Sequence, residues 1–312
     1  MFLIIALGYF LKRINLITET FAVEGNKIAF KVFLPCLLFT NIYSADIHTA
    51  FNHKLLLFTL ITLIITFIVI WFLVVIFFKS NYQRGVIIQG MYRSNFVILG
   101  LPVATNICGS EAAATIGILL AIVLPCYNVF SIIALEYFNT KHLLETKQQT
   151  ADIKWSATRQ IIKHIATNQL IIATFLAFVF ILLKIDIPNI IMQPINCLAD
   201  VATAMCLMIL GSFFKISDIN KSLKELCSVV IVKLLLLPLI LTAIAIALGF
   251  RGAELVSLLA IFATPTAVAG FTMAQTIGGD SDLAANIVVV TSFLSMFTLF
   301  IFTYILISLG FI

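Results

Sequence analysis

The stretch QGMYRSNFVILGLPVATNICG, residues 89–109, decides the fold, because it is an apolar helix that carries two polar residues and then meets a proline. Proline has no backbone N–H, and its ring clashes with the preceding turn of a helix. Gly100-Leu101-Pro102 therefore predicts a break or a sharp kink. If this helix lies in lipid, the freed backbone groups need partners, and such breaks occur where the chain is buried or lines a cavity.

The composition indicates that the whole chain is embedded in a membrane. Hydrophobic residues make up 62% of it and charged residues 11%, against about 25% charged residues in a soluble domain. The only extended polar stretch runs from residue 139 to residue 164. We therefore predict an all-α polytopic membrane protein surrounded by lipid. The net charge of +5 is read as a signal of orientation, so no nucleic-acid partner is expected.

Apolar runs of about 20 residues predict ten transmembrane helices. Five lie at 1–11, 28–47, 55–78, 86–107 and 112–137, and five lie at 165–183, 195–214, 227–248, 255–277 and 283–312. The first run is too short to cross a bilayer, so we expect a truncated first helix. Because five is odd, the second set begins on the opposite side of the membrane, which predicts inverted repeats over 1–138 and 165–312.

Lysine and arginine set the expected orientation. Twelve of them fall in the loops that would face inward, and only Lys54, Lys184 and Arg251 fall in loops that would face outward. This positive-inside bias places both termini outside and the 139–164 loop in the cytoplasm.

A second proline lies at the centre of the ninth span, where Pro102 lies in the fourth. Thr264-Pro265 is typical of a helix start, with threonine as the cap and proline in the first position. Pro102 follows leucine, so the N–H groups beyond it would be free. Helix N-termini attract carboxylates and phosphates, which predicts an anion site between two broken helices. The alternative is that both prolines merely kink packed helices.

Two polar residues of the opening stretch could contact such an anion. Asn95 lies two helical turns before Pro102 on nearly the same face, although it could equally form an interhelical hydrogen bond. Arg93 points nearly the opposite way; it is a candidate counter-ion, or it pairs with a carboxylate or guards the inner vestibule. The candidate substrate-binding set is completed by Asn41, Val103, Pro265 and Thr266.

The sequence contains few of the features that indicate an enzyme active site. The six cysteines form no close pairs, the four histidines fall in predicted loops, and the motifs of hydrolases, zinc proteases and nucleotide-binding loops are missing. We expect no enzyme activity, no metal and no cofactor. Lys233 and Asp200 are the other charges deep in apolar runs, and either could belong to an ion path or to a structural pair.

The chain resembles the auxin efflux carrier family, which includes plant carriers and bacterial carriers of malate or malonate. The resemblance rests on LGYFLK (7–12), LPCLLF (34–39), RSNFVILGLP (93–102), PTA (265–267) and GGD (278–280). It implies ten helices in two inverted five-helix repeats, with the fourth and ninth helices crossing at their prolines. Helices 1, 2, 6 and 7 would form a scaffold domain, and helices 3–5 and 8–10 a transport domain.

The resemblance also implies residue roles. Pro102 and Pro265 match the crossing prolines, Asn95 matches an asparagine associated with substrate in plant members, and Arg93 matches an arginine of bacterial members. The short central loop is similar to that of bacterial members, which implies the bacterial inner membrane, and we also allow for a homodimer. We therefore predict a secondary carrier of a small organic anion that works by alternating access. The alternative is a channel or a non-transporting receptor on the same scaffold.

Overall fold

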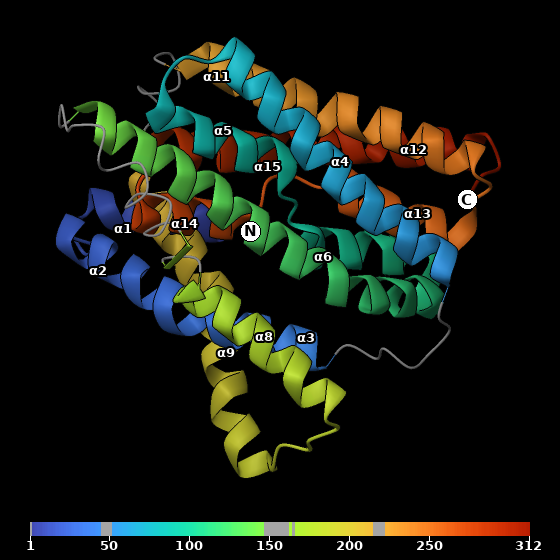
Figure 1. The fold of residues 1–312 in the computed structure, drawn as a ribbon, viewed down its shortest axis with the longest axis horizontal. Helices are drawn as coiled ribbons and strands as arrows, with labels where there is room; N and C mark the ends of the chain where they lie inside the picture. Colours follow the sequence, from blue (N-terminus) through green and yellow to red (C-terminus); the bar gives the residue numbers. More distant parts are fainter. Residues whose placement is uncertain (1, 45–51, 147–161, 164–165, 215–221) are drawn as a thin grey trace.

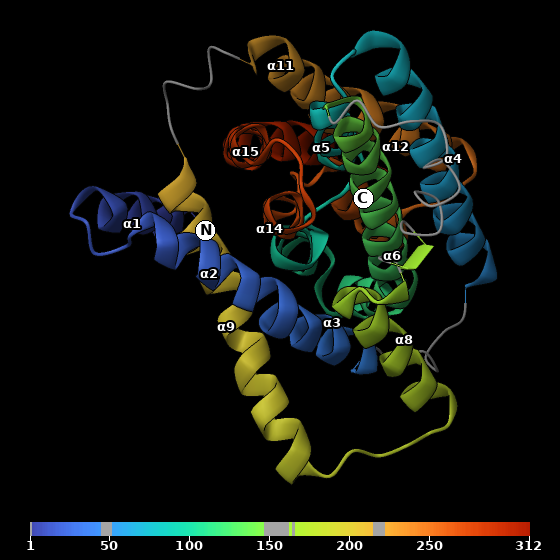
Figure 2. The same cartoon turned by 60° about the vertical axis from the view of Figure 1, so that its left-hand side comes forward.

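The computed structural model describes residues 2–44, 52–146, 162–163, 166–214 and 222–312, and all their regular structure is helical (Figure 1). Two groups of helices lie side by side (Figure 2). The first group comprises α1 (Phe2–Arg13), α2 (Glu19–Ile28), the π-helical turn η1 (Ala29–Phe33), α3 (Leu34–Tyr43), α8 (Gln169–Leu182) and α9 (Asn189–Phe213). The second comprises α4 (His53–Phe77), α5 (Asn81–Tyr92), the π-helical turn η2 (Phe96–Gly100), α6 (Leu101–Thr146), α11 (Leu223–Ile231), the π-helical turn η4 (Val232–Leu236), α12 (Leu237–Ala247), α13 (Gly252–Ala263), α14 (Val268–Ile277) and α15 (Ser281–Ser308).

Six helical stretches in the described residues are long and apolar enough to cross a membrane. They are His53–Phe77, Asn81–Thr146, Asn189–Phe213, Leu223–Ala247, Gly252–Ile277 and Ser281–Ser308. Gln169–Leu182 is a shorter apolar helix. The prediction of an all-α membrane protein is confirmed at this level, whereas the count of ten crossings and the inverted repeat stay predictions.

Helix α6 consists of two helical segments that meet at a kink at Gly109 (φ 63°, ψ −145°), between the predicted spans 86–107 and 112–137, and the second segment is longer than the sequence predicts. It continues to Thr146, so the predicted loop at 139–164 begins too early, and residues 147–161 of that loop lie outside the described part. The first predicted loop residue, Asn139, is helical and donates its side-chain amide to the carbonyl of Ile277 at 2.8 Å. This contact with the end of α14 stabilises the extra turns.

The predicted break at Gly100–Pro102 is wrong in position. Helix α5 ends at Tyr92, and η2 begins at Phe96, so residues 93–95 form the interruption. Pro102 instead lies in the first turn of α6. The N–H of Leu101 bonds the carbonyl of Phe96, five residues back, and this wider π-helical turn accommodates the missing N–H of the proline.

The same pattern recurs at two other prolines. Pro35 follows η1 and Pro238 follows η4, in each case as the second residue after the π-helical turn. A π-helical turn changes the local hydrogen-bond register, which relieves the conflict between the proline ring and the carbonyl one turn back. Three prolines of this chain thus widen a helix rather than end it.

The break in the ninth predicted span does lie at its proline, although its geometry differs from the prediction. Thr264 is the C-cap of α13 rather than the cap of a new helix, and α14 begins after Ala267. Pro265 lies in the extended segment between them. A residue before proline avoids the helical region of backbone space, which explains why α13 ends at Thr264.

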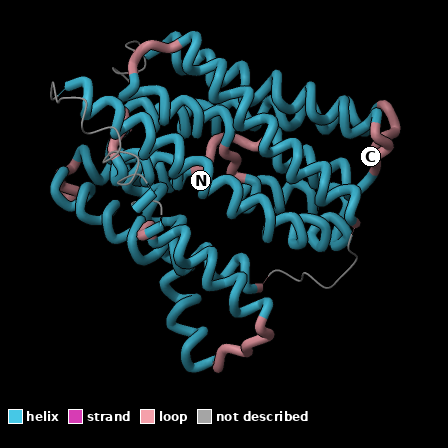
Figure 3. The backbone as a smooth tube through the Cα atoms, viewed as in Figure 1, coloured by secondary structure: helices cyan, strands magenta, loops and turns pink. Residues whose placement is uncertain are grey.

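The two interruptions cross each other and bond directly. The N–H of Asn95 donates to the carbonyl of Pro265 at 2.8 Å, and the hydroxyls of Ser94 and Thr264 are hydrogen-bonded. The Thr266 hydroxyl donates to the carbonyl of Gly90 at 2.6 Å. Both breaks appear as loop segments inside the helical body (Figure 3). Each interrupted helix therefore supplies partners for backbone groups that the other leaves unpaired.

Helices α1 and α9 approach each other closely at two glycines. A Cβ atom at Gly211 would lie 2.0 Å from the carbonyl oxygen of Ile5, and a Cβ at Gly8 would lie 2.0 Å from that of Met208. Small residues allow this kind of close helix packing in membranes.

We expect Gly211→Ala to destabilise the protein by about 1–3 kcal/mol, because the added methyl group overlaps the backbone of α1. The measurement is the midpoint of thermal unfolding in detergent. Gly117→Ala is the matched control, since a Cβ at Gly117 meets nothing within 4 Å and alanine favours a helix. Equal midpoints for the two variants would contradict the close packing of α1 and α9.

We expect Thr266→Val to lower the free energy of unfolding by about 1–3 kcal/mol, because it leaves the buried carbonyl of Gly90 without its donor. Thr59→Val serves as the control. Thr59 is also fully buried, and its hydroxyl has no partner in the described residues, so this change should be neutral or stabilising. The measurement is the midpoint of thermal unfolding of each variant, compared with that of the unsubstituted protein. An unchanged midpoint for Thr266→Val would refute the role of this hydrogen bond.

Candidate functional site

A cavity of about 120 Å³ lies between the two groups of helices, next to the crossing. The first group contributes residues of α3, α8 and α9, and the second contributes the interruption at 93–95, η2, α6 and the start of α14. The described residues that line it are Leu34, Leu37, Leu38, Asn41, Arg93, Ser94, Asn95, Val97, Ile98, Leu124, Tyr127, Leu170, Thr203, Cys206, Ala267, Val268 and Ala269.

Three of the predicted site residues line this cavity, namely Asn41, Arg93 and Asn95. Four do not. Pro102 is exposed and Val103 half-buried in the first turn of α6, whereas Pro265 and Thr266 are buried in the crossing itself. The prolines and their neighbours therefore position the breaks, while the cavity surface comes from residues on either side of them.

The face argument that separated Arg93 from Asn95 does not hold. It assumed one continuous helix through residue 102, but the chain leaves the helix after Tyr92. Arg93 takes extended backbone angles, which turns the next residues toward the cavity. Both polar side chains consequently reach the same space.

Arg93 is 4% exposed, so its side chain is buried within the protein. One guanidinium nitrogen, Nη1, lies 3.0 Å from the sulfur of Met273. No carboxylate of the described residues pairs with it. A buried guanidinium whose partner is a thioether sulfur is poorly compensated, and an anion in the cavity would supply the missing charge.

Two helix N-termini open on the cavity. Asn95 precedes the first turn of η2, whose Val97 and Ile98 line the cavity. Ala267 precedes α14, whose Val268 and Ala269 line it from the other side. The first N–H groups of a helix have no partner within that helix, and they carry the positive end of its dipole. The free N–H groups expected after Pro102 thus lie after Asn95 instead.

No Asp or Glu is among the described residues that line this cavity. Its charged and dipolar groups are Arg93 and the two helix N-termini, all of one sign. This combination selects for an anion and disfavours a cation.

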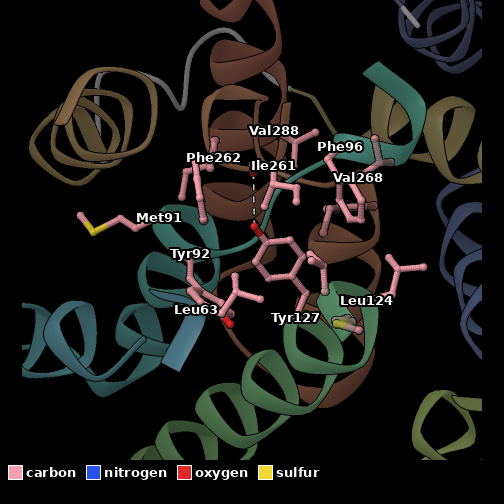
Figure 4. Packing of buried hydrophobic residues seen from close by; sticks show 14 of the residues in the cluster. Leu63, Met91, Tyr92, Phe96, Leu124, Tyr127, Ile261, Phe262, Val268 and Val288 are labelled. Atoms are coloured by element: carbon pink, nitrogen blue, oxygen red, sulfur yellow. Dashed lines mark hydrogen bonds between the residues drawn. The ribbon is translucent and has the colours of Figure 1, made fainter. Parts of the chain in front are cut away.

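Tyr127 was not among the predicted site residues, although it forms part of the cavity wall. Its hydroxyl donates to the carbonyl of Ile261 at 3.3 Å (Figure 4). Its ring packs edge-on against Tyr92, with ring centroids 5.0 Å apart. The hydroxyl therefore ties α6 to α13, and the ring presents an apolar surface to the cavity. The one sequence signal for it was a phenol in the interior of a long apolar run.

A larger cavity of about 710 Å³ lies at the start of α4, and none of the predicted site residues lines it. It includes the first turn of α4, but it also contains the carboxylates of Glu111 and Glu254 beside Lys54, so its charge is mixed and does not favour an anion. Among the residues that the structure describes, no group of His, Cys, Asp and Glu side chains is arranged to hold a metal ion.

Comparison with known proteins assigns this chain to a family. Residues 1–303 match the family described as membrane transport protein, whereas no curated protein matches the chain. The matched region includes both interrupted helices and every residue of the cavity. The chain therefore belongs to this membrane transport family, which is a family of transporters of the auxin efflux carrier type and not of enzymes.

Proposed function

We propose that this protein is a secondary carrier that moves a small organic anion across the membrane by alternating access. The observation that carries the proposal is the convergence of two half-helix N-termini and Arg93 on one cavity, whose described lining residues include no carboxylate. Broken helices whose N-termini meet at an anionic group are a recurring design of carrier sites.

The proposed topology has ten crossings in two inverted five-helix repeats. Described helical structure lies within each of the ten predicted ranges, and the two interrupted helices lie in the fourth and ninth ranges. The first group of helices would be the scaffold domain, and the second would be the transport domain. We place the protein in a bacterial inner membrane with both termini outside, as the distribution of lysine and arginine favours.

The size and charge of the cavity favour a short dicarboxylate such as malonate or malate. A cavity of about 120 Å³ is close to the roughly 150 Å³ that holds a benzene molecule in a protein interior. A dicarboxylate has one carboxylate for the helix N-termini and a second for the guanidinium of Arg93. An auxin-like aryl acid carries one carboxylate and a larger ring, so it is the second choice.

Uptake by purified protein in liposomes tests this function. We expect saturable uptake of labelled malonate or malate, with counterflow when the same acid is loaded inside. Flux without saturation or counterflow would favour a channel, and binding without flux would favour a receptor. If no dicarboxylate or aryl carboxylate moves under any ion gradient, the carrier proposal fails.

Arg93→Gln and Asn95→Ala should each weaken binding of the transported dicarboxylate by about 10- to 100-fold, the worth of a hydrogen bond to a charged group. The measurement is the concentration dependence of uptake, supported by calorimetry of the purified protein. Ile65→Ala is the control, because Ile65 lies on α4 and is 54% exposed. An affinity loss of the same size in the control would show that the effect is not specific to the cavity.

Alternating access requires the two groups of helices to move past each other at α14. The Sγ of Cys206 on α9 lies 3.6 Å from the Oγ1 of Thr272 on α14. The side-chain amide of Asn26 on α2 also donates to the carbonyl of Thr272 at 3.2 Å. These contacts must separate if α14 moves with the second group.

Thr272→Cys should therefore form a disulfide with Cys206 on oxidation and stop uptake, and a reducing agent should restore it. The other five cysteines are replaced by serine so that only one disulfide can form. Thr272→Cys with Cys206→Ser is the control that cannot cross-link. Mass spectrometry measures how much of the protein is cross-linked. If cross-linked protein still shows full uptake, this movement is ruled out.

A further inference from the structure

Lys233 is a second buried cation, and the cavity does not use it. Its side chain is 1% exposed within η4. It makes no hydrogen bond or ion pair with the part of the chain that the structure describes. Removing an ammonium group from water without a partner is costly, so its surroundings must compensate it in another way.

Packing places Lys233 at the level of the crossing. At Gly90 of α5, an added Cβ would contact the side chains of Val229 and Ile287. Lys233 lies one helical turn beyond Val229, and Thr291 lies one turn beyond Ile287. The helices α11–η4–α12 and α15 run in the same direction (Figure 1). The backbone N–H of Thr266 donates to the hydroxyl of Thr291 at 3.3 Å. Thr291, and with it Lys233, therefore lies at the depth of the break after α13.

Two of the helices packed around Lys233 end at the crossing, so their last backbone carbonyl groups lie there. The turn η4 contacts α5, α13 and α15, and α5 and α13 are the halves whose C-termini meet at the crossing. Some of their last carbonyls are used within the protein; those of Gln89, Gly90, Ala260 and Ile261 accept hydrogen bonds there. The final two carbonyls of each helix lie nearest the break, and α15 adds the hydroxyl of Ser292, which is buried without a partner.

The crossing therefore has two electrostatically different sides. The N-termini of η2 and α14 open on the cavity, where an anion is favoured. The C-termini of α5 and α13 carry the opposite end of the helix dipole, which favours a cation. Half-helix C-termini and unwound carbonyls are the groups with which ion-coupled carriers hold an exchangeable cation.

We propose that the ammonium group of Lys233 is a built-in cation at the carbonyl side of the crossing, in the place where an ion-coupled carrier would bind sodium. Its charge compensates the negative dipole ends of α5 and α13, and the protein moves its anion without sodium. The second step rests on the proposed carrier function, whereas the first concerns the folded protein alone.

Thermal unfolding of the full-length protein in detergent tests the first step, with sodium chloride and choline chloride compared at equal concentration. The unsubstituted protein should unfold at the same temperature in both salts. Lys233→Met should unfold at a lower temperature in choline, and sodium should restore part of the loss by binding at the vacated carbonyls. Lys233→Arg keeps the charge and should be indifferent to sodium. Leu63→Met, at a buried position of α4 that is 1% exposed, is the matched control and should not respond to sodium.

Uptake of malonate or malate in liposomes tests the second step. The unsubstituted protein should transport equally well with sodium or choline outside. Lys233→Met should lose about tenfold in uptake in choline, the size expected when a charge that compensates helix C-termini in a buried place is removed.

Two results would overturn the inference. The first is a higher unfolding temperature of the unsubstituted protein in sodium than in choline. The second is an unfolding temperature of Lys233→Met that equals that of the unsubstituted protein in both salts. If Lys233→Met does not fold, the Lys233→Arg variant and the sodium response of the unsubstituted protein still decide. If the unsubstituted protein moves no carboxylate, the carrier proposal fails, and the unfolding experiment decides about Lys233 separately.

Discussion

Every backbone polar group within the bilayer must find a partner inside the protein, and the rest of this structure depends on how the two interrupted helices meet that requirement. A single broken helix would leave about four N–H and four carbonyl groups unpaired on either side of its gap. Here the two gaps lie against each other, and the N–H of Asn95 bonds the carbonyl of Pro265. Side-chain hydroxyls of Ser94, Thr264 and Thr266 satisfy further groups. The groups left over are the N-termini that face the cavity and the carbonyls behind it.

This arrangement explains why a chain with so few charges keeps two of them buried near its centre. Arg93 lies at the cavity and Lys233 lies one layer behind it, both at most 4% exposed. A charge in that position costs several kcal/mol unless dipoles or counter-charges compensate it. The carbonyl ends of α5 and α13 can compensate a lysine permanently. Arg93 faces helix N-termini of its own sign, so it gains most from an anion that comes and goes.

Much of the helical architecture could be predicted from the sequence, because long apolar runs in a membrane protein have few alternatives to helix. The starts of several helices were also legible in principle. Asn52, Asn168 and Asp280 each cap a helix with their side-chain oxygen. The end of α6 was not predicted, since it depends on the contact of Asn139 with α14, which is distant in sequence.

The positions of the breaks were harder to predict, and the reason lies in what proline can do. Pro102 and Pro265 occupy the middle of the fourth and ninth predicted spans, yet one follows a π-helical turn and the other lies in a true gap. The chain leaves the helix at Arg93 because the N–H of Asn95 bonds another segment, and no local pattern encodes that tertiary contact. The same error misplaced the candidate residues Pro102 and Val103, whereas Arg93, Asn95 and Asn41 line the cavity.

The crossing also limits how the protein can move. The hydrogen bonds between the two interruptions join α5, α6, α13 and α14 into one unit, because removing any of them would expose unpaired backbone in the membrane interior. In the described residues, each hydrogen bond between α14 and the first group involves a side chain, such as those of Asn26 with Thr272 and Thr276. A side-chain hydrogen bond contributes only about 1 kcal/mol net, so it can be exchanged for another during a conformational change. If the protein works by the proposed alternating access, the boundary between α14 and the first group, where the cavity lies, is the surface along which its two parts would separate.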